Sequence, residues 1–358
     1  MGLGGIVIGR WSDKVGAAWP AAIAGVSIAL GSVVIAMTRD EWVYLAAHGI
    51  LIGFFGNGAL FAPLLANITR WFDRHRGIAI ATAASGQGLG GALWPPLFRY
   101  GIETWGWPTT FIAFAVVCAA IVVPLAYVLR ARPPVAPPEI VRGDADGLVL
   151  GLPSVVVLGA LSLAIVGCCV AMAMPIVHVV AHATDLGHSA TRAAELLSLL
   201  LASAFVGRLF WGALCDRIGG LKTLFLGVLG QGIVLTAYLG VESLVGLYIV
   251  SIFFGLAFGG VIPSYTIVVR DLYPASEIGW RIGVVYMFGT LGMAIGGWLG
   301  GAIFDWLAIY RPAFVLGIAF NVATLGVVGW MVMRQTRFGA PDGSGATLRF
   351  SGPSGRAA

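Results

Sequence analysis

Charged residues are scarce in this sequence. Asp, Glu, Lys and Arg together make up 10% of the 358 residues, whereas about a quarter of a soluble domain is charged. Hydrophobic residues make up 59%. Such a chain cannot cover a globular surface with polar groups, which excludes an ordinary water-soluble protein. We therefore expect an all-α, polytopic membrane protein whose helices contact the lipid bilayer.

Groups of residues that carry enzyme chemistry are also missing. The four cysteines have neither the spacing of a metal site nor that of a disulfide framework. The sequence shows no nucleophile–base pair, no metal-ligand cluster and no nucleotide-binding loop, so we expect no enzyme activity, no metal, no cofactor and no ATP drive. The net charge of +5 is spread over alternate loops rather than gathered in one patch, which argues against a nucleic-acid partner.

Apolar runs of the length that crosses a bilayer, about 20 residues, follow one another along the chain. The first run, from Gly2 to about Ile8, is too short and resembles the tail of a longer helix. Ten full runs follow, at Ala21–Met37, Val43–Asn67, Gly77–Phe98, Thr109–Leu129, Pro153–Val180, Ala193–Leu214, Leu224–Leu239, Leu244–Val269, Ile282–Phe304 and Pro312–Met333. The pattern predicts about 11 spans, of which the first is shortened.

One short motif occurs twice, half a chain length apart. Gly9–Gly16 and Gly212–Gly219 both read Gly-x-x-x-Asp-(Arg/Lys)-x-Gly, and their aspartates, Asp13 and Asp216, are 203 residues apart. A half-length repeat in a very apolar chain indicates a transporter built from two similar bundles. We predict an N-terminal helical bundle over residues 1–130 and a C-terminal helical bundle over residues 151–334.

The segments outside the bundles are polar and rich in helix-breaking residues. Residues 131–150 contain four prolines, which cannot continue a helix, so we predict a linker there. Residues 335–358 are rich in Gly and Ser and predict a disordered tail. Sixteen Arg and Lys residues fall in one set of loops and four in the opposite set. This asymmetry predicts a cytoplasmic linker and C-terminus, and we expect the bacterial inner (plasma) membrane.

The paired motif resembles the loop signature of the major facilitator superfamily, and the resemblance covers residues 1 to about 334. It implies two pseudo-symmetric bundles of six helices, with the first helix missing here. It also implies that each motif aspartate pairs with neighbouring charges and latches the outward-facing state, Asp13 with Arg70 or Arg74, and Asp216 with Arg270 or Arg281. The implied latch residues are Gly9, Asp13, Lys14, Gly16, Arg70, Gly212, Asp216, Arg217, Gly219 and Arg270.

One charge lies deep inside a predicted span. Arg208 precedes Leu214 by six residues, so it lies about 9 Å inside the helix end. A guanidinium in the bilayer is costly and usually faces a cavity, and its fork fits a carboxylate. The run Gly207–Gly212 resembles the eighth helix of the monocarboxylate transporters and the oxalate/formate antiporters, which implies that Arg208 binds an organic anion. The alternative is an arginine that reaches the membrane interface or pairs with a helix carbonyl.

Other polar residues in the spans must find partners inside the protein. As further substrate-binding candidates we name Asn57, Gln87, Tyr265 and Tyr286, each of which could equally tie helices together. His178 is the candidate for proton coupling, because an imidazole titrates near neutral pH. A histidine that only forms a hydrogen bond at the outer rim is the alternative.

Together these features predict a secondary active transporter of a small organic anion that works by alternating access, with proton symport or anion exchange, as a monomer. Ala204 stands where the monocarboxylate group has an aspartate, which is a departure from that group. No second cation is evident to hold the other end of a dicarboxylate, so a monocarboxylate fits better. One alternative is a drug or metabolite efflux carrier, which an acidic residue in the cavity would favour. Another is a non-transporting membrane sensor or degenerate fragment, which the missing first helix favours.

Overall fold

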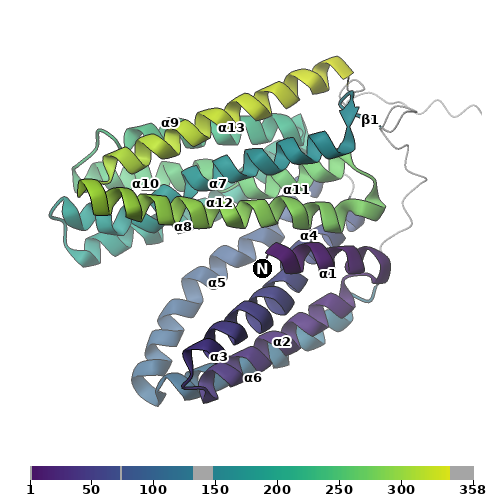
Figure 1. The fold of residues 1–358 in the computed structure, drawn as a ribbon, viewed down its shortest axis with the longest axis vertical. Helices are drawn as coiled ribbons and strands as arrows, with labels where there is room; N and C mark the ends of the chain where they lie inside the picture. Colours follow the sequence, from purple (N-terminus) through teal and green to yellow (C-terminus); the bar gives the residue numbers. More distant parts are fainter. Residues whose placement is uncertain (1, 73–74, 132–147, 339–358) are drawn as a thin grey trace, which may run out of the picture.

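A computed structural model describes residues 2–72, 75–131 and 148–338, and nearly all of them are helical (Figure 1). The first bundle consists of α1 (Gly2–Val15), α2 (Ala18–Met37), a composite helix of α3 (Glu41–Ala46), the π-helical segment η1 (Ala47–Asn57) and α4 (Gly58–Trp71), and then α5 (Arg76–Trp105) and α6 (Trp107–Val128). A two-stranded hairpin of β1 (Leu148–Val149) and β2 (Leu152–Pro153) leads into the second bundle.

The second bundle begins with α7 (Ser154–Asp185), α8 (Ala190–Ile218) and α9 (Gly220–Ala237). It continues with a span broken into α10 (Leu244–Phe258) and α11 (Val261–Leu272), the short 3-10 turn η2 (Ala275–Glu277), α12 (Ile278–Leu307) and α13 (Arg311–Phe338). Every predicted span is therefore a helix, and the all-α, polytopic fold class is confirmed. Among the described residues, nine helical spans are long and apolar enough to cross a membrane, whereas α1 has only 14 residues.

Short polar residues set several helix starts. Asp40 accepts hydrogen bonds from the amides of Trp42 and Val43 at 2.8 and 3.1 Å, which begins α3. Ser243 accepts a bond from the Gly246 amide at 3.3 Å and begins α10 in the same way. These caps satisfy amides that lack partners within the helix, and they explain why the spans stop and restart within a few residues.

Close helix contacts in the second bundle depend on glycine. α7 lies at the centre of this bundle and packs against α12, where Gly292 and Gly296 face it. A Cβ atom on Gly292 would lie 2.6 Å from the Val166 carbonyl oxygen, and one on Gly296 would lie 2.7 Å from the Val170 carbonyl oxygen. Only glycine allows the two backbones to approach this closely, as is usual for helices packed in lipid.

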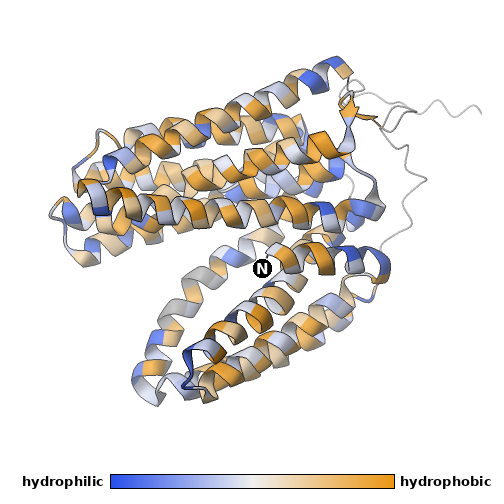
Figure 2. Cartoon of the chain, in the orientation of Figure 1, coloured by the Kyte–Doolittle hydropathy of each residue, from blue (hydrophilic) through white to orange (hydrophobic). Residues whose placement is uncertain are grey.

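The two bundles meet at one end of the molecule, which we call the linker end. The β-hairpin and the last turn of α13 lie there, and the ribbons of the two bundles diverge toward the opposite, far end (Figure 1). Hydrophilic residues gather toward the helix ends, and hydrophobic residues occupy the middle of the helices (Figure 2). This distribution is that of a protein whose helices cross a bilayer.

The hairpin and α13 adjust the predicted boundaries. α13 continues to Phe338, four residues beyond the predicted end of the C-terminal bundle at 334. Arg334 donates a hydrogen bond to the Leu150 carbonyl at 3.1 Å, which ties the hairpin to this last turn. Most of the predicted linker, residues 132–147, and most of the predicted tail, residues 339–358, lie outside the described residues.

Candidate functional site: the contacts between the bundles

The aspartate of the first motif contacts the opposite bundle. Asp13, near the end of α1, accepts hydrogen bonds from the amides of Gly279 and Trp280 at 3.0 and 3.1 Å, in the first turn of α12. Its carboxylate also forms an ion pair with Arg70 at 2.8 Å, and the Asp13 side chain is only 5% exposed. A carboxylate at a helix N-terminus is favoured both by the free amides and by the helix dipole.

The second motif makes the same contact in the reverse direction. Asp216, near the end of α8, accepts hydrogen bonds from the amides of Gly77 and Ile78 at 2.6 and 3.1 Å, in the first turn of α5. Asp13 therefore joins the first bundle to α12, and Asp216 joins the second bundle to α5. Two equivalent contacts, related by the internal repeat, therefore join the two bundles at the linker end.

The motif glycines allow these contacts to form. A Cβ on Gly212 would lie 2.7 Å from the Gly77 carbonyl oxygen, and a Cβ on Gly9 would lie 2.6 Å from the Gly279 carbonyl oxygen. The last glycine of each motif, Gly16 or Gly219, follows its helix with φ of +86° or +87°. That left-handed conformation is strained for any residue with a side chain, so the repeat preserves one turn geometry in both bundles.

The charged partners expected for the motifs are only partly found. The contact of Asp13 with Arg70 is confirmed, and Arg74 lies outside the described residues. The expected contact of Asp216 with Arg281 is wrong, because Arg281 is held inside the second bundle. It forms an ion pair with Glu277, donates to Ser154 Oγ at 2.9 Å, and lies 4.0 Å from the centre of the Tyr273 ring. Among the described residues, the Asp216 carboxylate is bound by the amides at the N-terminus of α5.

The remaining latch candidates lie near these contacts. Lys14 and Arg217 are exposed in the last turns of α1 and α8, and Arg270 lies in the last turn of α11.

Burial raises the pKa of the Tyr273 phenol to about 12, although the charge of Arg281 acts in the opposite direction. Tyr273 therefore stays protonated at neutral pH and donates a hydrogen bond to the Ser154 carbonyl at 3.1 Å.

Arg208 lies at the contact between α8 and α5, further from the linker end than Asp216. Its Nη1 donates a hydrogen bond to the Ala84 carbonyl oxygen at 2.7 Å. The Nε–H is buried and has no hydrogen-bond partner among the described residues. The expected alternative, an arginine paired with a helix carbonyl, is thus present, and the carbonyl belongs to the opposite bundle.

A small cavity lies between the bundles beside α12. It contains about 240 Å³ of empty space, part of it open to the outside. Its lining comes from α1, η1, α4 and α12 and consists of Gly2, Gly5, Asn57, Gly58, Phe61, Ala62, Gly283, Tyr286 and Thr290. Two of the predicted substrate-binding residues, Asn57 and Tyr286, therefore come together although they are far apart in sequence.

Tyr286 connects this cavity to the rest of the second bundle. Its hydroxyl lies 2.6 Å from Thr266 Oγ1 and donates to the Ile262 carbonyl at 3.2 Å, and its ring meets the edge of Phe61 from the first bundle. Thr290, which the sequence analysis did not name, follows Tyr286 by one helical turn, a spacing that could have identified it.

The other predicted residues are placed elsewhere. Gln87 is exposed on α5, next to Gly88. Tyr265 is fully buried inside the second bundle, and its hydroxyl has no partner among the described residues. His178 is buried between α7 and α12, where its Nε2 lies 3.0 Å from the Gly297 carbonyl oxygen and its ring packs near Tyr310. Neither Tyr265 nor His178 lines the cavity beside α12.

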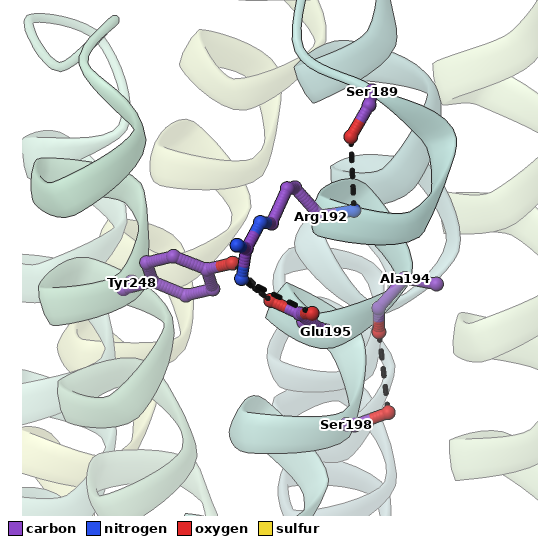
Figure 3. Close-up of polar contacts among 6 residues, drawn as sticks. All are labelled: Ser189, Arg192, Ala194, Glu195, Ser198 and Tyr248. Atoms are coloured by element: carbon purple, nitrogen blue, oxygen red, sulfur yellow. Dashed lines mark hydrogen bonds and ion pairs between the residues drawn. The ribbon is translucent and has the colours of Figure 1, made fainter.

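An acidic residue that the sequence analysis passed over lies near the far end of α8. Glu195 forms an ion pair with Arg192 at 3.0 Å and accepts a hydrogen bond from the Tyr248 hydroxyl of α10 (Figure 3). Ser189 caps this end of α8 by accepting a bond from the Arg192 amide (Figure 3). Glu195 is thirteen residues from Arg208, which is about 20 Å along a helix, so it does not compensate the Arg208 charge.

Comparisons with known proteins agree with this architecture. A family model described as Major Facilitator Superfamily matches the chain twice, over residues 1–160 and 159–351. MFS-type transporter pynF of Aspergillus niger is 29% identical over 305 residues, which are 84% of this chain and 69% of the relative. Monocarboxylate transporter 13 of Bos taurus is 29% identical over 340 residues, which are 90% of this chain and 78% of the relative.

A solved structure has the same fold. The crystal structure of the human organic anion transporter MFSD10 (TETRAN) superimposes with a TM-score of 0.70 at 17% sequence identity, covering 91% of this chain and 80% of that one. At this identity the similarity concerns the fold alone.

Proposed function

The chain belongs to the major facilitator superfamily of membrane transporters, and we propose that it carries a small organic anion, a monocarboxylate in the first instance, by alternating access. It is a transporter rather than an enzyme. The transport step is either proton symport or anion exchange, and the transporting unit is a monomer. The two bundles would rock about the site between them so that it opens to each side of the membrane in turn.

The placement of Arg208 carries the proposal of an anionic substrate. This guanidinium lies between the bundles and uses one donor on a neutral carbonyl. Its buried Nε–H has no acceptor in the part of the chain that the structure describes, which leaves both a positive charge and a donor for a carboxylate to satisfy. Asn57, Gln87 and Tyr286 would contact the rest of the substrate, and Tyr265 would support them from inside the second bundle. The bovine relative, a monocarboxylate transporter, favours the same class.

The two motifs support a role in switching. We place the linker end in the cytoplasm because the Arg and Lys residues gather there, which is the usual asymmetry of plasma-membrane proteins. The bonds of Asp13 and Asp216 would then keep the cytoplasmic side closed, and their release would open it. His178 stays the candidate for proton coupling, because its imidazole lies at the α7–α12 contact, with Nε2 3.0 Å from the Gly297 carbonyl oxygen.

Efflux of cationic compounds is less well supported. A carrier of that kind needs an acidic group in its cavity, and the described residues that line the cavity beside α12 include none. Glu195 is paired with Arg192 near the far end.

Uptake into proteoliposomes tests the proposal. Radiolabelled L-lactate, pyruvate and benzoate are offered to vesicles that contain the wild type, Arg208→Ala or Arg192→Ala. The last variant is the matched control, because Arg192 lies on the same helix but contacts Glu195 near the far end. We expect loss of saturable uptake in Arg208→Ala and retention in Arg192→Ala.

The same vesicles distinguish the two coupling modes. Uptake that needs an inward proton gradient indicates symport, whereas uptake that needs preloaded anion indicates exchange. Equal uptake by the wild type and Arg208→Ala would remove the anion site. Absence of uptake of all three anions by the wild type would remove the proposed substrate class.

A further inference from the structure

Arg208 and the carbonyl that it contacts lie on different bundles. The arginine belongs to α8 in the second bundle, and Ala84 belongs to α5 in the first bundle. A guanidinium is planar, and it can bind a carboxylate with two parallel bonds only if its plane is correctly oriented. The hydrogen bond from Nη1 to the Ala84 carbonyl occupies one edge of the guanidinium. On the other edge the Nε–H has no partner among the described residues. The contact with α5 therefore fixes which edge of the guanidinium is available.

The Ala84 carbonyl can accept this bond because of Gly88. A carbonyl oxygen inside a helix bonds to the amide four residues later and keeps a second lone pair. Arg208 approaches that lone pair beside Gly88. A Cβ atom on Gly88 would lie 3.7 Å from Nη1 of Arg208. This distance is an ordinary van der Waals contact, so a methyl group fits there, whereas a larger side chain would occupy the path of the guanidinium.

We propose that α5 positions the substrate-binding group of α8. The Ala84 carbonyl orients the guanidinium of Arg208, and Gly88 leaves the space for it. The inference rests on the proposed function, in which Arg208 binds the carboxylate. Because the two partners lie on different bundles, the site is fully formed only while α5 lies against α8, as it does with the linker end closed. The affinity for the anion is then higher in this state than after α5 and α8 separate at the linker end.

The expected effect follows from one hydrogen bond to a charged group. Such a bond contributes about 1.5 kcal/mol or more, which corresponds to about a tenfold change in a dissociation constant. Gly88→Val should therefore weaken binding of L-lactate, pyruvate and benzoate by about tenfold. Gly88→Ala should bind nearly as the wild type does, because the methyl group fits.

The test measures binding of these three anions to the purified full chain in lipid nanodiscs by isothermal titration calorimetry. Gly86→Val is the matched control, because a Cβ at Gly86 on the same helix has nothing within 4 Å. Thermal unfolding of each variant shows whether it is folded. The expected result is weaker binding in Gly88→Val alone, with melting temperatures close to that of the wild type.

A double-mutant cycle separates positioning from general damage to the helix. Lysine binds a carboxylate as a point charge and needs no fixed plane, so Gly88→Val should have little further effect in an Arg208→Lys background. An equal loss in both backgrounds would overturn the inference, and so would wild-type binding in Gly88→Val. Neither result affects the proposed function, which fails if Arg208→Ala binds as the wild type does. Absence of binding to the wild type would remove both.

Discussion

Replacing Asp13 by asparagine should open the linker end. In the structure Oδ1 of Asp13 accepts from Arg70 and from the Gly279 amide, and Oδ2 accepts from the Trp280 amide. Asparagine has the same shape but only one oxygen, so its NH₂ group must face at least one of these donors. The variant loses one charge-assisted bond and leaves Arg70 without its carboxylate.

The size of the effect follows from these contacts. A hydrogen bond to a charged group contributes about 1.5–3 kcal/mol, and the Asp13 side chain is well shielded from water. A loss of about 2 kcal/mol would change the ratio of closed to open molecules by about 30-fold. Asp216 is exposed and sits at a helix N-terminus, where the contribution is about 1 kcal/mol or less, so Asp216→Asn should have the smaller effect.

Electron paramagnetic resonance can measure this ratio. Spin labels at Val15→Cys and Ser276→Cys, in a background without the four native cysteines, report the distance between α1 and the turn before α12. The long-distance population should increase strongly in Asp13→Asn. Asp40→Asn is the control, because Asp40 also caps a helix but within one bundle. An unchanged distance distribution, or a change in substrate affinity without a change in transport rate, would refute the latch.

Three further predictions concern single positions. Gly77→Ala should lower the rate of anion uptake into proteoliposomes, because its Cβ would lie 2.2 Å from the Gly212 carbonyl oxygen. Gly86→Ala is the control and should leave this rate unchanged. Equal uptake rates in the two variants would contradict the close contact. Tyr286→Phe should weaken anion binding about fivefold by removing the bonds to Thr266 and Ile262, and Tyr265→Phe should change it by less than twofold in calorimetry. His178→Gln should abolish the pH dependence of uptake if this imidazole carries the coupled proton, and an unchanged pH profile would exclude it.

Much of the fold could be predicted because lipid restricts the chain so strongly. Every backbone group in the bilayer must bond internally, so each long apolar run could only become a helix. The repeated motif then indicated two bundles, and the contact of Asp13 with Arg70 followed from the resemblance. The helix ends were less predictable, since α7 continues to Asp185 and α13 to Phe338, beyond the apolar runs that predicted them.

The candidate site could be predicted only in part. Arg208, Tyr286 and Tyr265 are all predicted as site candidates for the same reason. Each is a polar residue inside a span and needs a partner in the protein. Polarity could not show which of them faces the other bundle. In the structure Tyr286 lines the cavity, whereas Tyr265 is enclosed by its own bundle. That difference depends on helix rotation, which the packing of whole helices sets.

The sequence by itself determined that this protein is helical, spans the membrane repeatedly and consists of two related bundles, because hydropathy and an internal repeat are local properties of the chain. Only the tertiary structure decided that Asp216 meets the first turn of α5 rather than Arg281, and that Arg208 bonds to Ala84. Both contacts join residues more than 120 positions apart. They depend on how one bundle lies against the other, and the order of residues within a helix does not fix that arrangement.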